Sequence, residues 1–319
     1  MQAPFTNTSE FISFLPGERV FVDRLSTFSP TVPGSSSSSS LPYVGVSEIS
    51  LNELDLSGSK VTNSFVLDMY SQFTNQRGFS LKAINLSFTA IIDTDLLPIL
   101  RNTGSSLVSL NLKGCLKLGS LAAEVITKFS SKRLEHFGAY DEVSAEQLVG
   151  LLACMSELKY LDLSHCRYIT AVVFDAMGAL KYLDLSNLNC NLEKAALKSW
   201  LSKHGRSLEA ILLAASPSDA PEETADDSTV AALAQTSAAS LALLDLSYCR
   251  GISAAAVKSL YSCAQLQVLR LGGAMASELD GQCLARLLVQ VPMIDQLELR
   301  RRHGSVRVSP ISNPSHGFI

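Results

Sequence analysis

Apolar residues recur along this chain in a short unit that is repeated ten times. The clearest copy is LKYLDLSHC at 158–166, and close copies begin at Leu180 and Leu241. Each unit carries apolar residues at most of offsets 0, 3 and 5 from its first Leu or Ile, and most units have a small polar residue or Cys at offset 8. This spacing is typical of a leucine-rich solenoid and not of a long helix or a hairpin. The units begin at Leu51, Leu81, Leu107, Leu134, Leu158, Leu180, Leu208, Leu241, Leu266 and Ile294.

The segments between the units predict helices on the return path. Unit starts are 22 to 33 residues apart, which leaves room for a helix in most repeats. Residues 144–147, SAEQ, form a capping box, and Thr170, Asn191 and Ser253 each precede an apolar-periodic segment as an N-cap. We therefore predict an α/β leucine-rich repeat horseshoe of about ten repeats, with a parallel sheet on the concave face and helices on the convex face.

Composition divides the chain into three parts. Residues 1–40 contain Pro-Gly pairs and a serine run at 35–40, which predict a flexible Pro/Ser-rich leader. Residues 41–300 hold the repeats, and residues 301–319 form a basic tail. Because an uncapped terminal strand is an adhesive edge, either the tail folds back over it or the sequence belongs to a longer product. An acidic Pro-containing insertion at 216–228 predicts a mobile loop, either a contact or phosphorylation site or simply a tolerated insertion.

Charge and composition argue against nucleic acid and membrane partners. The formal net charge is -4 and the isoelectric point is near 5.8, which gives no basic footprint. No run of 18 apolar residues exists and the first residues do not form a signal peptide, so we expect a cytoplasmic protein and leave a nuclear location open. The seven cysteines contain no C-x-x-C pair, which predicts reduced and mostly buried thiols.

Three units read LxxLxLxxC and end at Cys115, Cys166 and Cys249; the last two cysteines are followed by Arg-Tyr-Ile-Thr and Arg-Gly-Ile-Ser. This pattern resembles the cysteine-containing, ribonuclease-inhibitor-like leucine-rich repeats of F-box/LRR proteins and mitotic-exit-antagonist-type regulators. The resemblance implies a substrate-recognition or regulatory subunit in ubiquitin-dependent degradation, with ubiquitin-ligase components as partners. The alternative is a direct regulator or inhibitor of an enzyme or small GTPase.

The leader contains a partial resemblance to an F-box. Residues 15–18, LPGE, resemble its opening turn, which would lead into an apolar helix through Val20, Phe21 and Leu25. Pro30, Pro33 and the serine run interrupt the helical pattern before a second helix could form. The alternative is an extended leader that partly caps the first repeat.

Catalytic motifs are lacking in the sequence. No HExxH, G-x-S-x-G or P-loop stands in the required context, so we predict no enzyme, no cofactor and no metal. His165 and Cys166 are neighbours, but Cys166 falls in the turn column at offset 8, where we expect burial. A small side chain at offset 8 is expected to satisfy turn amides, with Glu142, Leu188 and Ala274 as the irregular positions.

The predicted binding surface is the concave face, where side chains at offsets 2, 4 and 6 point. Offset 4 is rich in acidic residues, which suggests a basic protein partner. The alternative is that Leu-Asp-Leu-Ser is simply the usual strand sequence of such repeats and that its carboxylates are solvated. Rings at offset 2 in three consecutive units predict an aromatic patch, and the alternative is cross-strand packing without a partner. Arg270 and the three arginines at 300–302 predict a basic patch at the C-terminal end of the concave face. The predicted partner-binding residues are His136, Tyr140, Tyr160, Asp162, Tyr182, Asp184, Asp245 and Arg270.

Overall fold

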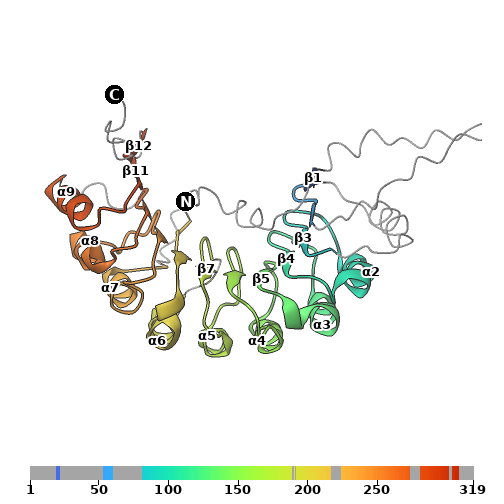
Figure 1. The fold of residues 1–319 in the computed structure, drawn as a ribbon. Helices are drawn as coiled ribbons and strands as arrows, with labels where there is room; N and C mark the ends of the chain where they lie inside the picture. The colour runs from blue at the N-terminus through green and yellow to red at the C-terminus, as the bar shows by residue number, and fades with distance from the viewer. Residues whose placement is uncertain are drawn as a thin grey trace, which may run out of the picture.

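The computed structural model describes residues 19–21, 53–59, 81–188, 190, 192–216, 224–273, 281–301 and 304–308. In this part of the chain, twelve strands form one sheet in sequence order from β1 to β12. The sheet curves into an arch, its strands line the inner side, and the helices lie along the outer side (Figure 1). The molecule is a leucine-rich repeat horseshoe, which confirms the predicted fold class.

Ten parallel strands match the ten predicted units, and each begins at offset 2 of its unit. Neighbouring strands pair at identical offsets, so that Tyr160 of β6 lies between His136 of β5 and Tyr182 of β7. Residues at one offset therefore form columns across the sheet. The strands are β2 (Glu53–Asp55), β3 (Ala83–Asn85), β4 (Ser109–Asn111), β5 (His136–Gly138), β6 (Tyr160–Asp162), β7 (Tyr182–Asp184), β8 (Ala210–Leu212), β9 (Leu243–Asp245), β10 (Val268–Arg270) and β11 (Gln296–Arg301).

Two further strands extend the sheet at its ends. β1 (Arg19–Phe21) pairs parallel with β2, so these three residues of the predicted leader form a strand and not the apolar helix that the F-box resemblance implied. β12 (Gly304–Val308) pairs antiparallel with β11, as expected if the tail folds back over the terminal strand. In both places another segment of the same chain pairs with a strand that would otherwise form the edge of the sheet. The rest of the leader and residues 309–319 lie outside the described residues.

The helices cover the convex side and start largely where the caps predict. Ser144 and Gln147 form the reciprocal capping box of α4, and the Ser253 side chain accepts a hydrogen bond from the Ala255 amide at the start of α8. Thr170 occupies the N-cap of α5 without a side-chain bond. The prediction of Asn191 as an N-cap is wrong, because α6 begins at Lys194 with Glu193 at its N-cap. The helices are α2 (Asp93–Thr103), α3 (Ser120–Phe129), α4 (Ala145–Cys154), α5 (Ala171–Ala176), α6 (Lys194–His204), α7 (Asp227–Thr236), α8 (Ala254–Ser259) and α9 (Gly281–Gln290).

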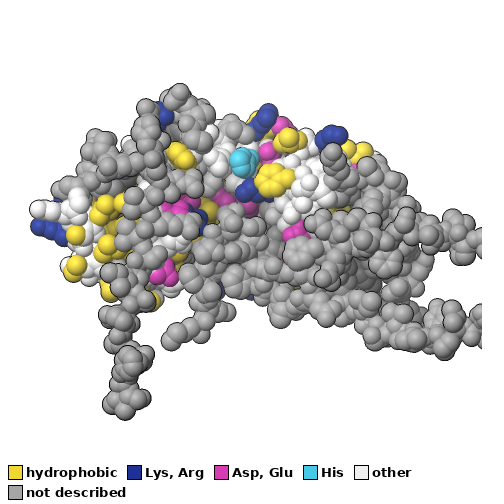
Figure 2. Space-filling model, turned by 90° about the horizontal axis from the view of Figure 1, so that it is seen from above, with side chains coloured by type: hydrophobic (Ala, Val, Ile, Leu, Met, Phe, Trp, Pro, Cys, Tyr) yellow, Lys and Arg dark blue, Asp and Glu magenta, His cyan; other side chains and the backbone are white. Residues whose placement is uncertain are grey.

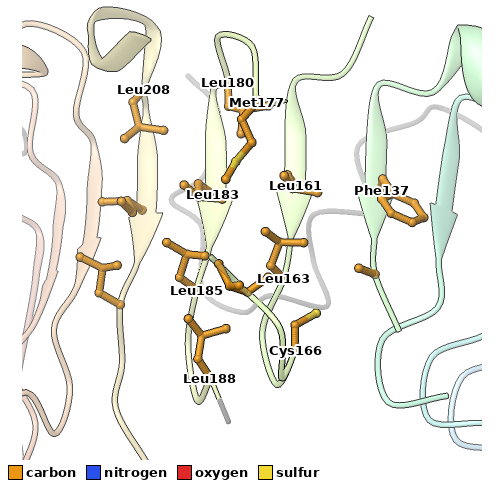
Figure 3. Packing of buried hydrophobic residues seen from close by; sticks show 14 of the residues in the cluster. Phe137, Leu161, Leu163, Cys166, Met177, Leu180, Leu183, Leu185, Leu188 and Leu208 are labelled. Atoms are coloured by element: carbon orange, nitrogen blue, oxygen red, sulfur yellow. The ribbon is translucent and has the colours of Figure 1, made fainter. Parts of the chain in front are cut away.

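The main core fills the space between the sheet and the helices. Leu161 and Leu163 of one repeat stack against Leu183 and Leu185 of the next, and all four are fully buried (Figure 3). Each such side chain contributes about 1.5–3 kcal/mol on burial, and every layer depends on the repeats on both sides. None of the helices in the described part of the chain is long and apolar enough to cross a membrane.

In seven repeats the turn after the strand has a left-handed residue at offset 7, and most of these turns have a small side chain at offset 8. Gly114 and Gly273 take positive φ values, and a Cβ on either would collide with the ring of Phe88 or Tyr248 from the preceding repeat. At offset 8 the Cys115 thiol donates to the Leu86 carbonyl at 3.0 Å, so the polar side chain satisfies a turn carbonyl and not the amide that we expected. None of the seven cysteines forms a disulfide, and five of them are buried, as predicted.

Candidate functional site

An aromatic pair lies at the middle of the concave face. The rings of His136 and Tyr160 stack with their centroids 4.2 Å apart and their planes 6° from parallel. Both residues are partly exposed. Desolvation lowers the pKa of His136, which keeps the imidazole neutral near pH 7. The predicted aromatic patch therefore exists as one stacked pair across two neighbouring strands.

Two tyrosines of the predicted patch are buried. Tyr182 is 5% exposed and Tyr140 is fully buried. Tyr140 follows the end of β5 at Gly138, where strand alternation no longer sets the side-chain direction, and its hydroxyl donates to the Gly119 carbonyl at 3.0 Å. Burial raises the pKa of Tyr140 far above its usual range. The predicted exposure of both side chains is wrong, and Tyr160 is the tyrosine of this set that solvent reaches.

The acidic column at offset 4 has a structural role that the sequence analysis did not predict. In six repeats, the Asp or Asn at this offset accepts a hydrogen bond from the backbone amide two residues later, which closes the turn at the end of the strand. A signal was present in the sequence, since Asp or Asn followed two residues later by Ser is a typical turn pattern. The pairs are Asp55 with Ser57, Asn85 with Ser87, Asn111 with Lys113, Asp162 with Ser164, Asp184 with Ser186 and Asp245 with Ser247.

Lys113 connects two of these carboxylates on the concave face. Its Nζ lies 3.3 Å from Asp162 Oδ2 and 4.0 Å from Asp184 Oδ2. Burial opposes the ammonium charge, but the two carboxylates outweigh it and raise the pKa of Lys113. Burial and the neighbouring Asp162 carboxylate raise the pKa of Asp184 to about 7. The Tyr182 hydroxyl lies 3.4 Å from Asp184 Oδ2, so this buried tyrosine belongs to the same polar cluster.

A second cluster of one cation and two carboxylates lies toward the C-terminal end. The Arg270 guanidinium lies 3.5 Å from Asp245 Oδ2 and 3.6 Å from Glu298 Oε2, with Arg270 side-chain exposure of 14%. The charge of Arg270, which we predicted to contribute to a basic end, is therefore compensated on both sides. Each cluster joins two carboxylates to one cation. The net negative charge of the whole concave face stays a prediction.

An apolar stripe on the concave face was missed. It consists of side chains at offsets 2 and 4 that form a small cluster separate from the main core. The sequence carried the signal, because offset 2 is apolar or aromatic in each strand from β7 to β10, and offset 4 is apolar in β8. We define the apolar stripe as Tyr182, Ala210, Leu212, Leu243 and Val268, which are 1–5% exposed.

The partly exposed residues define a central window beside this stripe, formed by Asn111, Lys113, His136, Tyr160 and Asp162. Figure 2, which looks onto the molecule from above, shows a histidine beside hydrophobic, acidic and basic side chains. The window thus offers a flat aromatic surface, a carboxylate and an ammonium group within three adjacent strands. Such a set suits the binding of a polypeptide surface, since aromatic and charged groups supply anchoring and orientation.

Groups suited to catalysis are not assembled in the described residues. His165 is held in a left-handed turn, while the neighbouring Cys166 thiol lies deep in the core with its pKa raised by burial. A thiol in this setting is a poor nucleophile. No group of three or more His, Cys, Asp or Glu side chains suited to a metal ion occurs among the residues that the structure covers.

The end of the acidic insertion is structural. Asp226 caps α7 by accepting from the Thr229 amide at 2.9 Å and forms an ion pair with Lys194 at 3.3 Å. Asp227 accepts from the Ser253 amide at 2.6 Å, which ties α7 to the next repeat. The contact-loop alternative therefore concerns residues 217–223, which lie outside the described residues.

Comparison with known proteins places the chain by its fold. No protein-family model matches the sequence, and no curated protein matches it. A chain in the crystal structure of the Rad7 and Elc1 complex in yeast matches with a TM-score of 0.62 and 19% identity, over 77% of this chain and 62% of that chain. This chain thus spans less than two thirds of that one.

Two further structures are leucine-rich repeat proteins of lower similarity. LegL7 from Legionella pneumophila has a TM-score of 0.44 and 17% identity, over 81% of this chain and 93% of that chain. A chain in the TLR13–ssRNA13 complex has a TM-score of 0.44 and 16% identity, over 78% and 32%. The likeness to solved structures concerns the fold.

Proposed function

We propose that this protein is a non-catalytic protein-interaction module that binds its partner at the central window. The observation that carries the proposal is the stacked, partly exposed pair of His136 and Tyr160 beside the Lys113–Asp162 ion pair. Rigid aromatic rings bury much area at small entropic cost, and the flanking charges orient the partner. Because each carboxylate cluster contains one cation for two acids, a partner with basic residues around an apolar or aromatic anchor fits this surface best.

The finer proposal is a role as substrate-recognition or regulatory subunit in ubiquitin-dependent degradation. The cysteine-containing repeats support it, as does the similarity in fold to a chain of the Rad7 and Elc1 complex. The second candidate is direct regulation of an enzyme or small GTPase through the concave face. These two proposed functions differ in the binding regions that they require. An adaptor needs a ligase-binding element outside the concave face, and a direct regulator does not.

The test is affinity capture with the intact chain from its native cell extract, followed by quantitative mass spectrometry. Tyr160→Ala together with Lys113→Ala should reduce capture of a partner at least tenfold, since both central contacts are lost. Tyr168→Ala is the matched control, because Tyr168 is also an exposed tyrosine but lies outside the concave strands at 48% exposure. Equal capture by the double variant and by the control would overturn the proposed site.

The same experiment separates the two functional classes. Cullin-ligase components retained by both the parent chain and the double variant, with a further protein lost only from the variant, would support the adaptor. A single partner without ligase components, lost from the double variant, would support the direct regulator. Circular dichroism melts of each variant verify that the fold is retained.

A further inference from the structure

Two neighbouring repeats carry the same four residues, Lys-Tyr-Leu-Asp, at 159–162 and 181–184. Their strands β6 and β7 pair in register, so the two lysines lie side by side where the strands begin and the two aspartates lie side by side where the strands end. The lysine and the aspartate of one copy are three residues apart, which is about 10 Å along a strand. The charge of these side chains therefore changes from positive to negative along the strand direction, with the tyrosines in between.

The two lysines, Lys159 and Lys181, form an accessible edge of the concave face, which we call the lysine edge. Their side chains are 44–46% exposed. Lys159 Nζ lies 2.8 Å from Glu135 Oε2, and Lys181 Nζ lies 2.8 Å from Glu209 Oε1. The hydrogen bond to Glu209 raises the pKa of Lys181, so this group is charged at neutral pH. Since each ammonium has three N–H donors, both lysines can bind a further acidic group.

The opposite end of the same strands is net negative above pH 7. The single ammonium of Lys113 lies between the Asp162 and Asp184 carboxylates, and Asp184, whose pKa is about 7, is ionised above that pH. Asp184 is buried and Asp162 is partly exposed, so Asp162 is the carboxylate that a partner can approach. Tyr160, stacked on His136, lies between the lysine edge and Asp162. An aromatic surface is thus flanked by a cationic site on one side and an anionic site on the other.

We infer that the partner of the central window is a polypeptide segment with an acidic side chain at the lysine edge, an apolar or aromatic side chain on the stacked rings and a basic side chain at Asp162. The inference rests on the proposed function and adds the acidic residue. A segment with bases on both sides of its anchor would place one of them against the lysine edge, where like charges repel. Residues i, i+4 and i+7 of a helix lie on one face and span about 10 Å, so an amphipathic helix along β6 presents the three side chains at this spacing.

Peptide selection on the intact chain at pH 8 tests this order of side chains. The probe is a phage-displayed library of random peptides long enough for several helical turns, and clones that also bind the Tyr160→Ala, Lys113→Ala double variant are removed. We expect the remaining clones to carry an acid and a base on opposite sides of an apolar or aromatic residue. Lys159→Glu with Lys181→Glu should weaken their binding at least tenfold and, in a new selection, should favour clones with bases on both sides.

Two further variants control for loss of the fold and for unspecific charge effects. Lys159→Met with Lys181→Met removes the charge of the lysine edge without reversing it and should weaken the same clones severalfold. Lys132→Glu with Lys203→Glu makes the same change of charge at exposed lysines outside the concave strands and should leave binding unchanged. Circular dichroism melts verify each variant.

Three outcomes would overturn the inference. They are clones whose charges all have one sign, clones that bind the charge-reversed variant as well as the parent chain, and the lack of any clone that needs the central window. The proposed function would survive each of them if a native partner is still captured in dependence on Tyr160 and Lys113. Failure of the inference and failure of the proposed function are therefore distinguishable.

Discussion

The two halves of the concave face share one backbone geometry and differ in what their side chains do. In the central window, offsets 2 and 4 carry His136, Tyr160 and Asp162, which are partly exposed and partly paired. In the apolar stripe, the same offsets carry Leu212, Leu243 and Val268, which are withdrawn from water. Since the strands pair in register throughout, the repeat fixes where a side chain points, and its chemistry decides whether that position stays open.

The comparison also separates charge from exposure. Asp162 and Asp184 occupy equivalent positions in adjacent strands and make the same turn hydrogen bond. The side chain of Asp162 is 18% exposed, whereas that of Asp184 is 2% exposed and lies where the window meets the stripe. Asp184 is therefore poorly hydrated and still lies beside the negative Asp162, and both effects raise its pKa. Its protonation state then changes with pH near neutrality.

The largest effect is expected from a polar substitution in the stripe. Leu243→Ser should lower the free energy of unfolding by about 2–4 kcal/mol, because a buried apolar side chain is lost and a hydroxyl is buried in its place. Urea denaturation followed by circular dichroism measures it. Val172→Ser is the control, since Val172 is 55% exposed and its replacement should change stability by less than about 0.5 kcal/mol. Equal losses in the two variants would show that the stripe is open in solution.

Removing the cation between the carboxylates should have the next largest effect. Lys113→Met should destabilise the protein by about 1–3 kcal/mol at pH 8, where Asp162 and Asp184 are left facing each other. The loss should shrink at pH 5, because Asp184 takes up a proton. Unfolding midpoints at the two pH values measure the difference. Lys117→Met removes a nearby exposed lysine and should show no such pH dependence.

The buried carboxylate itself predicts a pH dependence of stability. The pKa of Asp184 is about 7 in the folded protein, above the value near 3.9 of an unfolded chain. The folded state therefore holds this proton more tightly, and stability falls as the pH rises from about 4 to about 7. Asp184→Asn keeps the turn acceptor and removes the charge, so it should gain roughly 1–2 kcal/mol at pH 8 and little at pH 4. Thermal melts of both proteins across this range test it, and a parent protein with equal stability at pH 4 and pH 8 would contradict it.

The smallest change is expected at the exposed tyrosine. Tyr160→Ala should cost about 1 kcal/mol through loss of the stack with His136, whereas Tyr182→Ala in the next strand should cost about 3 kcal/mol. Thermal shifts of the two variants provide a direct comparison of the window with the stripe for one residue type. Equal costs would mean that the difference in burial between these adjacent positions does not hold in solution.

The repeats were predictable in detail because they follow from local spacing. Every strand from β2 to β11 lies in a predicted unit and begins at its offset 2, and the capping box of α4 forms as its sequence indicates. The stacked pair of His136 and Tyr160 follows from the same columns. The predicted turn role of offset 8 was right in position and wrong in partner, since a thiol such as Cys115 donates to a carbonyl of the preceding repeat.

What the sequence by itself determined was the register of the repeats, the direction of most side chains and the Asp and Asn residues at offset 4. These depend on alternation and spacing within one unit, which local residues set. Only the tertiary structure decided how deeply each position is buried and which charges are paired. Tyr182 and Tyr160 have the same place in the repeat, and Arg270 reads as a free cation until its neighbours in β9 and β11 are seen. Burial and pairing depend on residues far away in sequence, and no pattern within one repeat contains that information.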